Sequence, residues 1–281
     1  DFESVVRNIY GAIRGEVLAE RDEAGYEDVD FGDQEFAELQ GRERPKTKDE
    51  NSLIDQANII TNFARQRFNK PGIVVPHEAV HMIEKDKWPG KGSALFNEDL
   101  NAIAIREPEK NLILKKKLVH EMLHAKMSNL LPNPLKEALV ESLTKKLMKR
   151  YQEDPLTRGE LKDSEKLISA FGEERTEKGD ALFTEDTLLA YVGEDGRLHS
   201  ENFTYGRERN ILKTLTEKMY EKSEGRFTSS EEAFDALVKA DVTGNRDELG
   251  VIDECLGEGT LQKMYDAGDD VEALDSLVGS L

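Results

Sequence analysis

Two stretches of the chain repeat the pattern His-Glu-x-x-His, "HEAVH" at 77–81 and "HEMLH" at 120–124. The sequence has only five histidines, and these two stretches hold four of them. On a helix, residues i and i+4 share a face, so two imidazoles can hold one zinc ion while the glutamate takes a proton from water. The helix must be firmly packed, and a third protein ligand must come from elsewhere.

The second copy lies in the interior of a predicted helix. The stretch 109–129 has helical periodicity, with nearly three turns before the motif and another turn after it. The apolar positions that would bury the back of this helix are Leu112, Leu118, Val119, Met122, Leu123 and Met127. We therefore expect His120 and His124 to share one face of a rigid helix.

A second helix that carries two glutamates follows after a short turn. The stretch "PLKEALVESLTKKLMKRY" (134–151) predicts this helix, with Pro134 well placed in its first turn. Glu137 and Glu141 lie on one of its faces. A short loop makes the two helices antiparallel, so residues equidistant from the turn come together. Both glutamates are expected beside the two histidines.

The first copy has the same letters in a different context. "HEAVH" directly follows "IVVP", and Pro76 biases the residue before it toward extended backbone. The segment therefore reads as extended chain that runs into a strand. In that geometry His77 and His81 need not converge on a metal, and we interpret this copy as structural.

The second copy and the glutamates after it resemble the gluzincins, the thermolysin-like clan of zinc metallopeptidases. The compact layout over about 52–151 is most similar to the minigluzincins. The resemblance implies that His120 and His124 are zinc ligands and that Glu121 is the general base. Only 12 residues separate His124 from Glu137, fewer than in thermolysin.

The clan's second motif is matched by "KEALVE" (136–141). This match implies that Glu137 is the third zinc ligand. Glu141 falls on the carboxylate that hydrogen-bonds a ligand histidine, and it is also the alternative ligand. The clan commonly stabilises the oxyanion with a downstream His or Tyr, for which the candidates are His199 and Tyr205.

The expected fold class is α+β. The resemblance implies a zincin-like core, in which a small sheet packs on the active-site helix and the glutamate helix. A plausible hairpin over 93–107 resembles the sheet edge along which such enzymes lay an extended substrate. We expect three regions: an N-terminal helix and acidic arm (1–50), the core (51–152) and a mainly helical C-terminal subdomain (153–281).

Other elements follow from local patterns. Residues 2–20 predict an amphipathic helix, and residues 21–50 read as a linker or extended arm. Further helices are expected near 52–68, 160–172, 206–222, 229–240, 259–266 and at the C-terminus, with extended chain over 180–205. We interpret the acidic arm as a plain linker, and a self-inhibitory segment that lies across the cleft is the alternative.

Composition limits the partners. The formal net charge of −19 repels nucleic-acid phosphates and anionic membrane surfaces, so we expect neither partner. No apolar run approaches the roughly 20 residues of a membrane span. The single cysteine, Cys255, fits a reducing compartment. We expect a cytoplasmic protein, with a targeting segment removed before Asp1 as the alternative.

These observations favour a Zn²⁺-dependent metallopeptidase, and an endopeptidase in particular, with a peptide or protein as substrate. One alternative is a zincin-fold protein that binds a partner or regulates without proteolysis. A third reading is a structural protein in which both His-Glu-x-x-His copies are accidental.

Overall fold

The computed structural model describes residues 33–281 except 90–91, 174, 176–180 and 194. The helices are α2 (Asp33–Gln40), α3 (Lys48–Gln66), α4 (Asn111–Lys126), α5 (Asn133–Tyr151), α6 (Arg158–Phe171), α7 (Gly206–Lys222), α8 (Ser230–Thr243), α9 (Val251–Leu256), α10 (Thr260–Ala267) and α11 (Val271–Ser280). The strands are β1 (Val80–Ile83), β2 (Ala94–Asn97), β3 (Ala102–Arg106), β4 (Thr187–Val192) and β5 (Leu198–Asn202), and short 3₁₀ turns span His77–Ala79, Lys85–Lys87 and Arg246–Gly250. The helix predicted over 2–20 and the first part of the arm lie outside the described residues.

The fold is α+β, as predicted, and its first sheet is small and mixed. The strand order is β1-β3-β2, with β1 parallel and β2 antiparallel to β3. The hairpin predicted over 93–107 is therefore confirmed. Side chains of the central strand alternate between two faces. Ile103 and Ile105 join the main core, whereas Ala102 and Ala104 face a separate cluster that includes α2.

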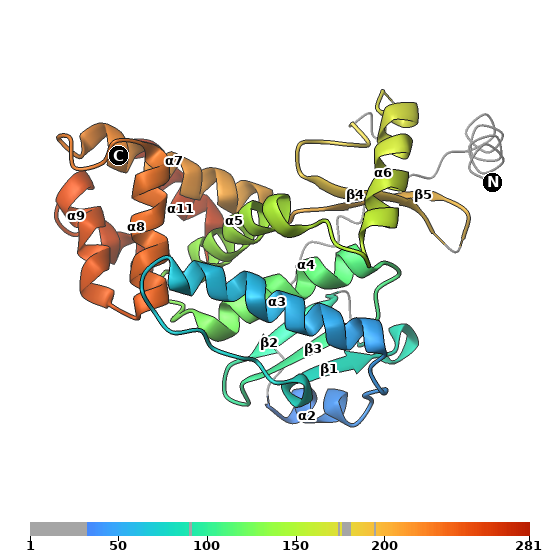
Figure 1. Cartoon of the computed structure of the whole chain (residues 1–281). Helices are drawn as coiled ribbons and strands as arrows, with labels where there is room; N and C mark the ends of the chain where they lie inside the picture. The colour runs from blue at the N-terminus through green and yellow to red at the C-terminus, as the bar shows by residue number, and fades with distance from the viewer. Residues whose placement is uncertain (1–32, 90–91, 174, 176–180, 194) are drawn as a thin grey trace.

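Helix α2 corrects the prediction of a linker over 21–50. Residues 33–40 are helical, and Phe36 and Leu39 are buried in the cluster on the far side of the sheet from α4 (Figure 1). The start of α3 at Lys48 also lies inside the predicted linker. The two buried apolar residues of α2 are too few to give a helical pattern, so its burial depends on the sheet face that it covers.

Helix α4 is enclosed by its neighbours. It packs against α3, α5 and strands β2 and β3. For this reason every residue from Leu112 to His124 is buried, including three lysines. Helix α3 is fixed at its start by a capping box, in which the Thr47 side chain accepts from Glu50 N–H and the Glu50 carboxylate accepts from Thr47 N–H. The helices predicted near 52–68 and over 109–129 are therefore confirmed.

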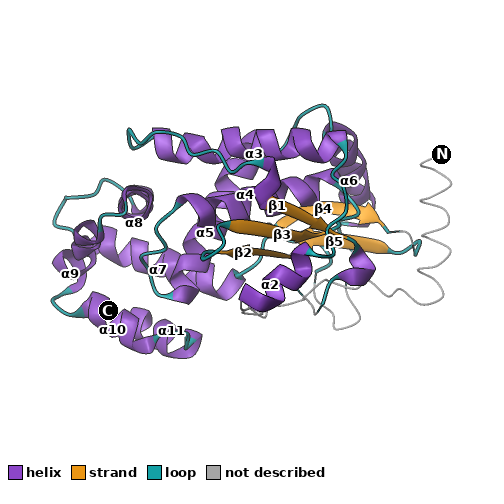
Figure 2. Ribbon diagram, turned by 90° about the horizontal axis from the view of Figure 1, so that it is seen from below, coloured by secondary structure: helices purple, strands orange, loops and turns teal. Residues whose placement is uncertain are grey.

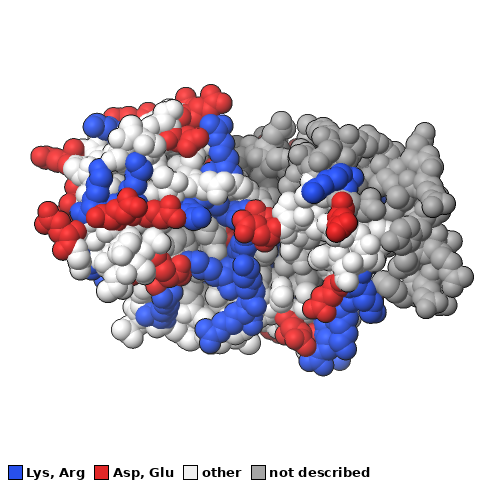
Figure 3. Space-filling model, turned by 90° about the horizontal axis from the view of Figure 1, so that it is seen from above, with Lys and Arg blue, Asp and Glu red and all other residues white. Residues whose placement is uncertain are grey.

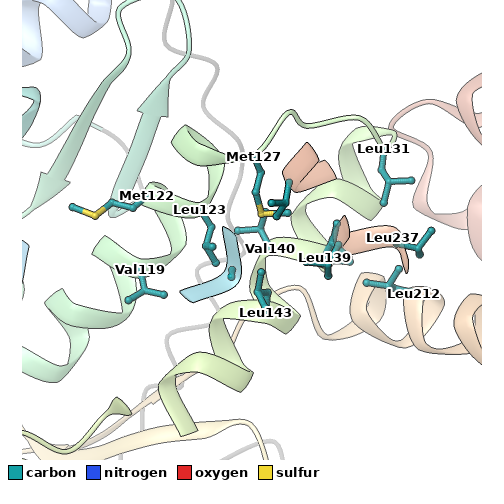
Figure 4. Packing of buried hydrophobic residues seen from close by; sticks show 14 of the residues in the cluster. Val119, Met122, Leu123, Met127, Leu131, Leu139, Val140, Leu143, Leu212 and Leu237 are labelled. Carbon is teal, nitrogen blue, oxygen red and sulfur yellow. The ribbon is translucent and has the colours of Figure 1, made fainter. Parts of the chain in front are cut away.

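The C-terminal region is mainly helical, as predicted. Helix α6 packs on the β4–β5 hairpin at one end of the molecule, and α8 to α11 gather at the other end (Figure 2). Helix α7 packs against α5 and α8. Figure 4 shows Leu139 of α5 close to Leu212 and Leu237 of the C-terminal helices. The short helix α9 and the turn before it were not predicted.

The described surface carries charges of both signs. Lysines and arginines are interspersed with aspartates and glutamates on the face in Figure 3. Of the helices in the described part of the chain, none is both long and apolar enough to cross a membrane.

Candidate metal centre

Helices α4 and α5 bring His120, His124 and Glu137 together. The Nε2 atom of His124 lies 3.1 Å from His120 Nε2 and 3.1 Å from Glu137 Oε2. The third side, from His120 Nε2 to Glu137 Oε2, is 3.5 Å. All three side chains are buried, and no other group of this kind occurs among the residues that the structure describes.

These three donors fit a tetrahedral zinc ion. Bonds of about 2.1 Å to a tetrahedral ion place its ligand atoms about 3.4 Å apart. The observed separations of 3.1 to 3.5 Å are close to that value. Two imidazoles and one carboxylate are also the donor types that zinc takes, and three protein ligands leave a fourth position for water or substrate.

Glu141 orients one of the histidines. Its Oε2 atom lies 2.8 Å from His120 Nδ1, and its side chain is fully buried. A proton on Nδ1 that is donated to this carboxylate leaves Nε2 of His120 available for a metal. The other oxygen of Glu141 accepts from the backbone N–H of Thr204 at 2.6 Å and from its hydroxyl at 2.9 Å.

The two glutamates make the site strongly anionic. Burial opposes ionisation of Glu137, but the positive charge of His124 and hydrogen bonds from both histidines hold the pKa of Glu137 far below its usual range. Burial also opposes a charged His120, yet its hydrogen bonds to Glu137 and Glu141 raise the pKa of His120 to about 10. Without a metal, these side chains bind protons, and a divalent cation that binds to the site displaces those protons.

Glu121 is next to the triad but does not take part in it. Its side chain is buried, and burial raises the pKa of its carboxyl group. Within the described ranges, no hydrogen bond or ion pair of this carboxylate is found. Glu121 instead lines a cavity of about 470 Å³ that His120, His124 and Glu137 also line. It is placed to exchange a proton with a water molecule in that cavity.

The edge of the sheet forms one wall of this cavity. Its lining also includes Ala94, Leu95, Phe96, Glu98, Asn129, Asn133, Lys136, Tyr205 and Asp269. Arg106 N–H donates to Ser93 O, and hydrogen-bonded pairs alternate along an antiparallel ladder. The backbone groups of Ala94 and Phe96 therefore point away from β3, toward the open edge of β2.

The two candidates for the oxyanion donor lie in different places. Tyr205 lines the cavity, and its ring is nearly parallel to that of His120 with 6.2 Å between centroids. His199 Nε2 lies 3.1 Å from Asp195 Oδ1, and its ring stacks on Tyr191. His199 is not among the residues that line the cavity. The catalytic role of His199 stays a prediction.

The first His-Glu-x-x-His copy does not form a site. His77 lies in a 3₁₀ turn and contacts Asp55, whereas His81 lies in β1 and contacts Glu43 and Gln40. The predicted strand is confirmed from Val80 onward, whereas His77–Ala79, which were predicted as extended chain, form a 3₁₀ turn. Cys255 is buried and forms no disulfide.

Sequence reasoning missed two residues that contact Glu141. Thr204 belongs to no recognisable motif, and nothing in the sequence indicates that it contacts Glu141 of α5, more than 60 positions earlier in the chain. Lys116 lies one turn before His120, within the three lysines of "LKKKL" (114–118), and it was not among the predicted site residues. Its i, i+4 spacing from His120, which places it on the face of the motif, could have identified it.

Comparison with family models, curated proteins and solved structures found no match to this chain.

Proposed function

We propose that this protein is a zinc-dependent metallopeptidase, and specifically an endopeptidase. The observation that carries the proposal is the buried triad of His120, His124 and Glu137, with the carboxylate of Glu121 beside it in one cavity and without a hydrogen bond or ion pair to any residue that the structure describes. This combination has the three ligands and the base that hydrolysis of a peptide bond requires.

The residues have distinct roles in the proposed reaction. Zinc, when bound by the triad, supplies the Lewis acid that activates water and polarises the scissile carbonyl. Glu121 accepts the proton of the attacking water and then delivers it to the leaving amine. The hydroxyl of Tyr205 is the proposed donor to the oxyanion, because Tyr205 lines the same cavity. Glu141 holds His120 in position.

The proposed substrate is an extended peptide or protein segment. The outward backbone groups of Ala94 and Phe96 offer a donor and acceptor pattern that an added strand can complete. This edge runs along the cavity that holds the triad, so the bound chain passes across the metal centre. The sequence also lacks the exopeptidase motif that large aminopeptidases of this clan carry before the zinc helix.

Two further proposals remain from the sequence. The chain could bind a partner or a metal through the same centre without proteolysis. The second proposal is self-inhibition by the acidic arm. Residues 33–50 of that arm include α2 and the start of α3 and do not line the cavity, so the proposal is limited to residues 21–32, which lie outside the described part of the chain.

Metal content and cleavage together test the function. We expect about one zinc per chain, lost in His120→Ala and in Glu137→Ala. His77→Ala is the matched control, because it removes a histidine of the other copy and should change neither zinc content nor cleavage. Glu121→Gln should keep the zinc but slow the cleavage of an unfolded protein by roughly 10²–10⁴-fold.

The outcomes separate the three readings. Zinc without cleavage in the wild type would favour the binding protein over the peptidase. An absence of zinc in the wild type would reject both and leave the structural reading. Zinc that persists in His120→Ala but disappears in His77→Ala would show that the site has been assigned to the wrong copy.

A further inference from the structure

Lys116 is a buried cation on the same helix as the metal ligands. Only 1% of its surface is exposed, although lysine is almost never fully buried without a partner. Its Nζ donates to the carbonyl oxygen of Asn202 at 3.0 Å and lies 3.4 Å from Glu141 Oε1 and 3.5 Å from Glu201 Oε1. Lys116 therefore joins three elements: α4, α5 and the end of β5.

The chain that leaves β5 is held at several consecutive residues. Thr204 donates to Glu141 through both its backbone N–H and its hydroxyl. The carbonyl oxygen of Thr204 accepts from Arg209 Nε at 2.8 Å. This segment, residues 201–205, is thus fixed to α4 by Lys116, to α5 by Glu141 and to α7 by Arg209.

Tyr205 ends this segment in a conformation that the surroundings impose. Its φ of 55° and ψ of 40° place a non-glycine residue in the left-handed region. Such backbone persists only where the neighbouring structure determines it, and it clusters at functional sites. In this conformation the Tyr205 ring lies parallel to His120 at the cavity wall.

We propose that Lys116 is a positioning residue, which fixes segment 201–205 and Glu141 to each other and thereby sets the places of both His120 and Tyr205 at the metal centre. The inference rests on the proposed zinc centre and extends it. Lys116 is not among the residues that line the cavity. It acts through Glu141 on His120 and through Asn202 on the segment that carries Tyr205.

The alternative is that Lys116 only fills space and balances charge. Removal of a buried positive charge near a divalent cation would then strengthen metal binding, because a repulsion is lost. Loss of positioning weakens metal binding instead. Residues that hydrogen-bond and orient a metal ligand, without binding the metal themselves, typically contribute 10- to 100-fold to metal affinity. The sign of the change in zinc affinity therefore separates the two roles.

Lys115 supplies a matched control. It is the neighbouring lysine of the same helix and is equally buried, but its Nζ contacts Asp154 and the carbonyl oxygen of Tyr151. We expect Lys116→Met to weaken zinc affinity roughly tenfold, and Lys115→Met to change it less than about twofold. The measurement is competition with a chromophoric zinc chelator on the folded full-length variants.

A second variant keeps the test decisive if Lys116→Met does not fold. Thr204→Val preserves the volume and the backbone N–H but removes the hydroxyl that donates to Glu141. We expect it to weaken zinc affinity by about threefold or more. Unchanged or tighter zinc binding in Lys116→Met would overturn the proposal. If only Thr204→Val folds, unchanged binding in that variant would overturn it.

Cleavage kinetics test the effect on Tyr205. If Lys116 acts through Tyr205, the single substitution Lys116→Met should lower kcat strongly at saturating zinc. When it is added to Tyr205→Phe, the same substitution should lower kcat little further. Additive effects would contradict this part, because residues that act through one another are non-additive. A wild-type protein that binds no zinc would refute the proposed function itself, whereas normal zinc binding with equal effects of Lys115→Met and Lys116→Met would refute only this inference.

Discussion

His120 combines two properties at the scale of the single residue. Its Nε2 faces the other ligands of the triad, and its Nδ1 faces the buried carboxylate of Glu141. Without a metal, hydrogen bonds to the carboxylates of Glu137 and Glu141 keep the His120 imidazole protonated and raise its pKa from 6.5 to about 10. A metal ion bound by the triad would take the place of the proton on Nε2 of His120, while Nδ1 keeps its proton toward Glu141.

This competition predicts that zinc affinity depends on pH. Below a pKa of about 10, His120 must release its proton before zinc binds, so the apparent zinc affinity should rise about tenfold per pH unit between about pH 6.5 and 8.5. The check is a chelator-competition titration over that range. Glu141→Gln removes one of the carboxylates that raise the pKa, so its affinity should level off at a lower pH. A wild-type affinity that is independent of pH would contradict the proposed linkage.

The stability of the metal-free protein should change in the opposite direction. A histidine whose pKa is raised in the folded state contributes stability that is fully present below its unfolded pKa of about 6.5. That contribution is lost as the pH rises toward about 10. We expect urea denaturation in the presence of a chelator to show lower stability at the alkaline end, with a weaker trend in His120→Ala.

At the scale of the element, strand β2 has two different edges. One edge pairs with β3, and the backbone of Ala94 and Phe96 on the other edge faces the cavity. The short turn between α4 and α5 places the triad beside this edge. A strand with one open edge can accept an extended peptide, whereas a strand inside a sheet cannot.

Proline substitutions distinguish the two edges of β2. Phe96→Pro removes an outward N–H that the ladder does not use, so the fold should persist while KM for a peptide rises roughly fivefold, the loss of about one hydrogen bond. Leu95→Pro removes an N–H that points to β3, and it should lower stability by about 3 kcal/mol. Peptide kinetics and thermal denaturation measure both. An unchanged KM in a folded Phe96→Pro variant would show that the substrate does not use this edge.

Across the whole molecule, the C-terminal helices contact the loop that connects the two helices of the candidate metal site. The loop between α4 and α5 is fixed by α8, because Leu130 N–H donates to Asp241 Oδ1 at 2.9 Å and Ser128 N–H donates to the backbone carbonyl of Asp241. The hydroxyl of Tyr265 in α10 donates to the carbonyl oxygen of Leu130. One cluster of buried apolar residues has members from Leu53 to Val278, on both sides of residue 152. The division of the chain into two regions at residue 152 stays a prediction.

Asp241 tests this dependence. Asp241→Ala leaves the Leu130 N–H without its partner, so we expect a loss of about 2 kcal/mol in the free energy of unfolding and weaker zinc binding. Asp241→Asn keeps the accepting oxygen and should recover most of both. Asp247→Ala, at an exposed position after the same helix, should change stability by less than about 0.5 kcal/mol. Equal stability of the Ala and Asn variants at 241 would mean that this contact does not fix the loop.

The sequence by itself determined the parts that depend on local spacing. The i, i+4 histidines, the apolar back of their helix, and the short connection to Glu137 and Glu141 all follow from helical geometry, which repeats every few residues. The sequence also predicted the hairpin and the strand that contains His81, but not the 3₁₀ turn that contains His77. Pro76 and the alternation of apolar residues act over only a few positions.

Only the tertiary structure decided which distant groups complete the site. Helix α2 is buried by a sheet face that forms from other segments, and its own two buried apolar residues give no helical pattern. The contact of Thr204 with Glu141 joins residues 63 positions apart in the chain, and that of Lys116 with Asn202 joins residues 86 positions apart. Such contacts depend on how helices and strands pack, because a buried charge is stable only where the folded chain brings it a partner.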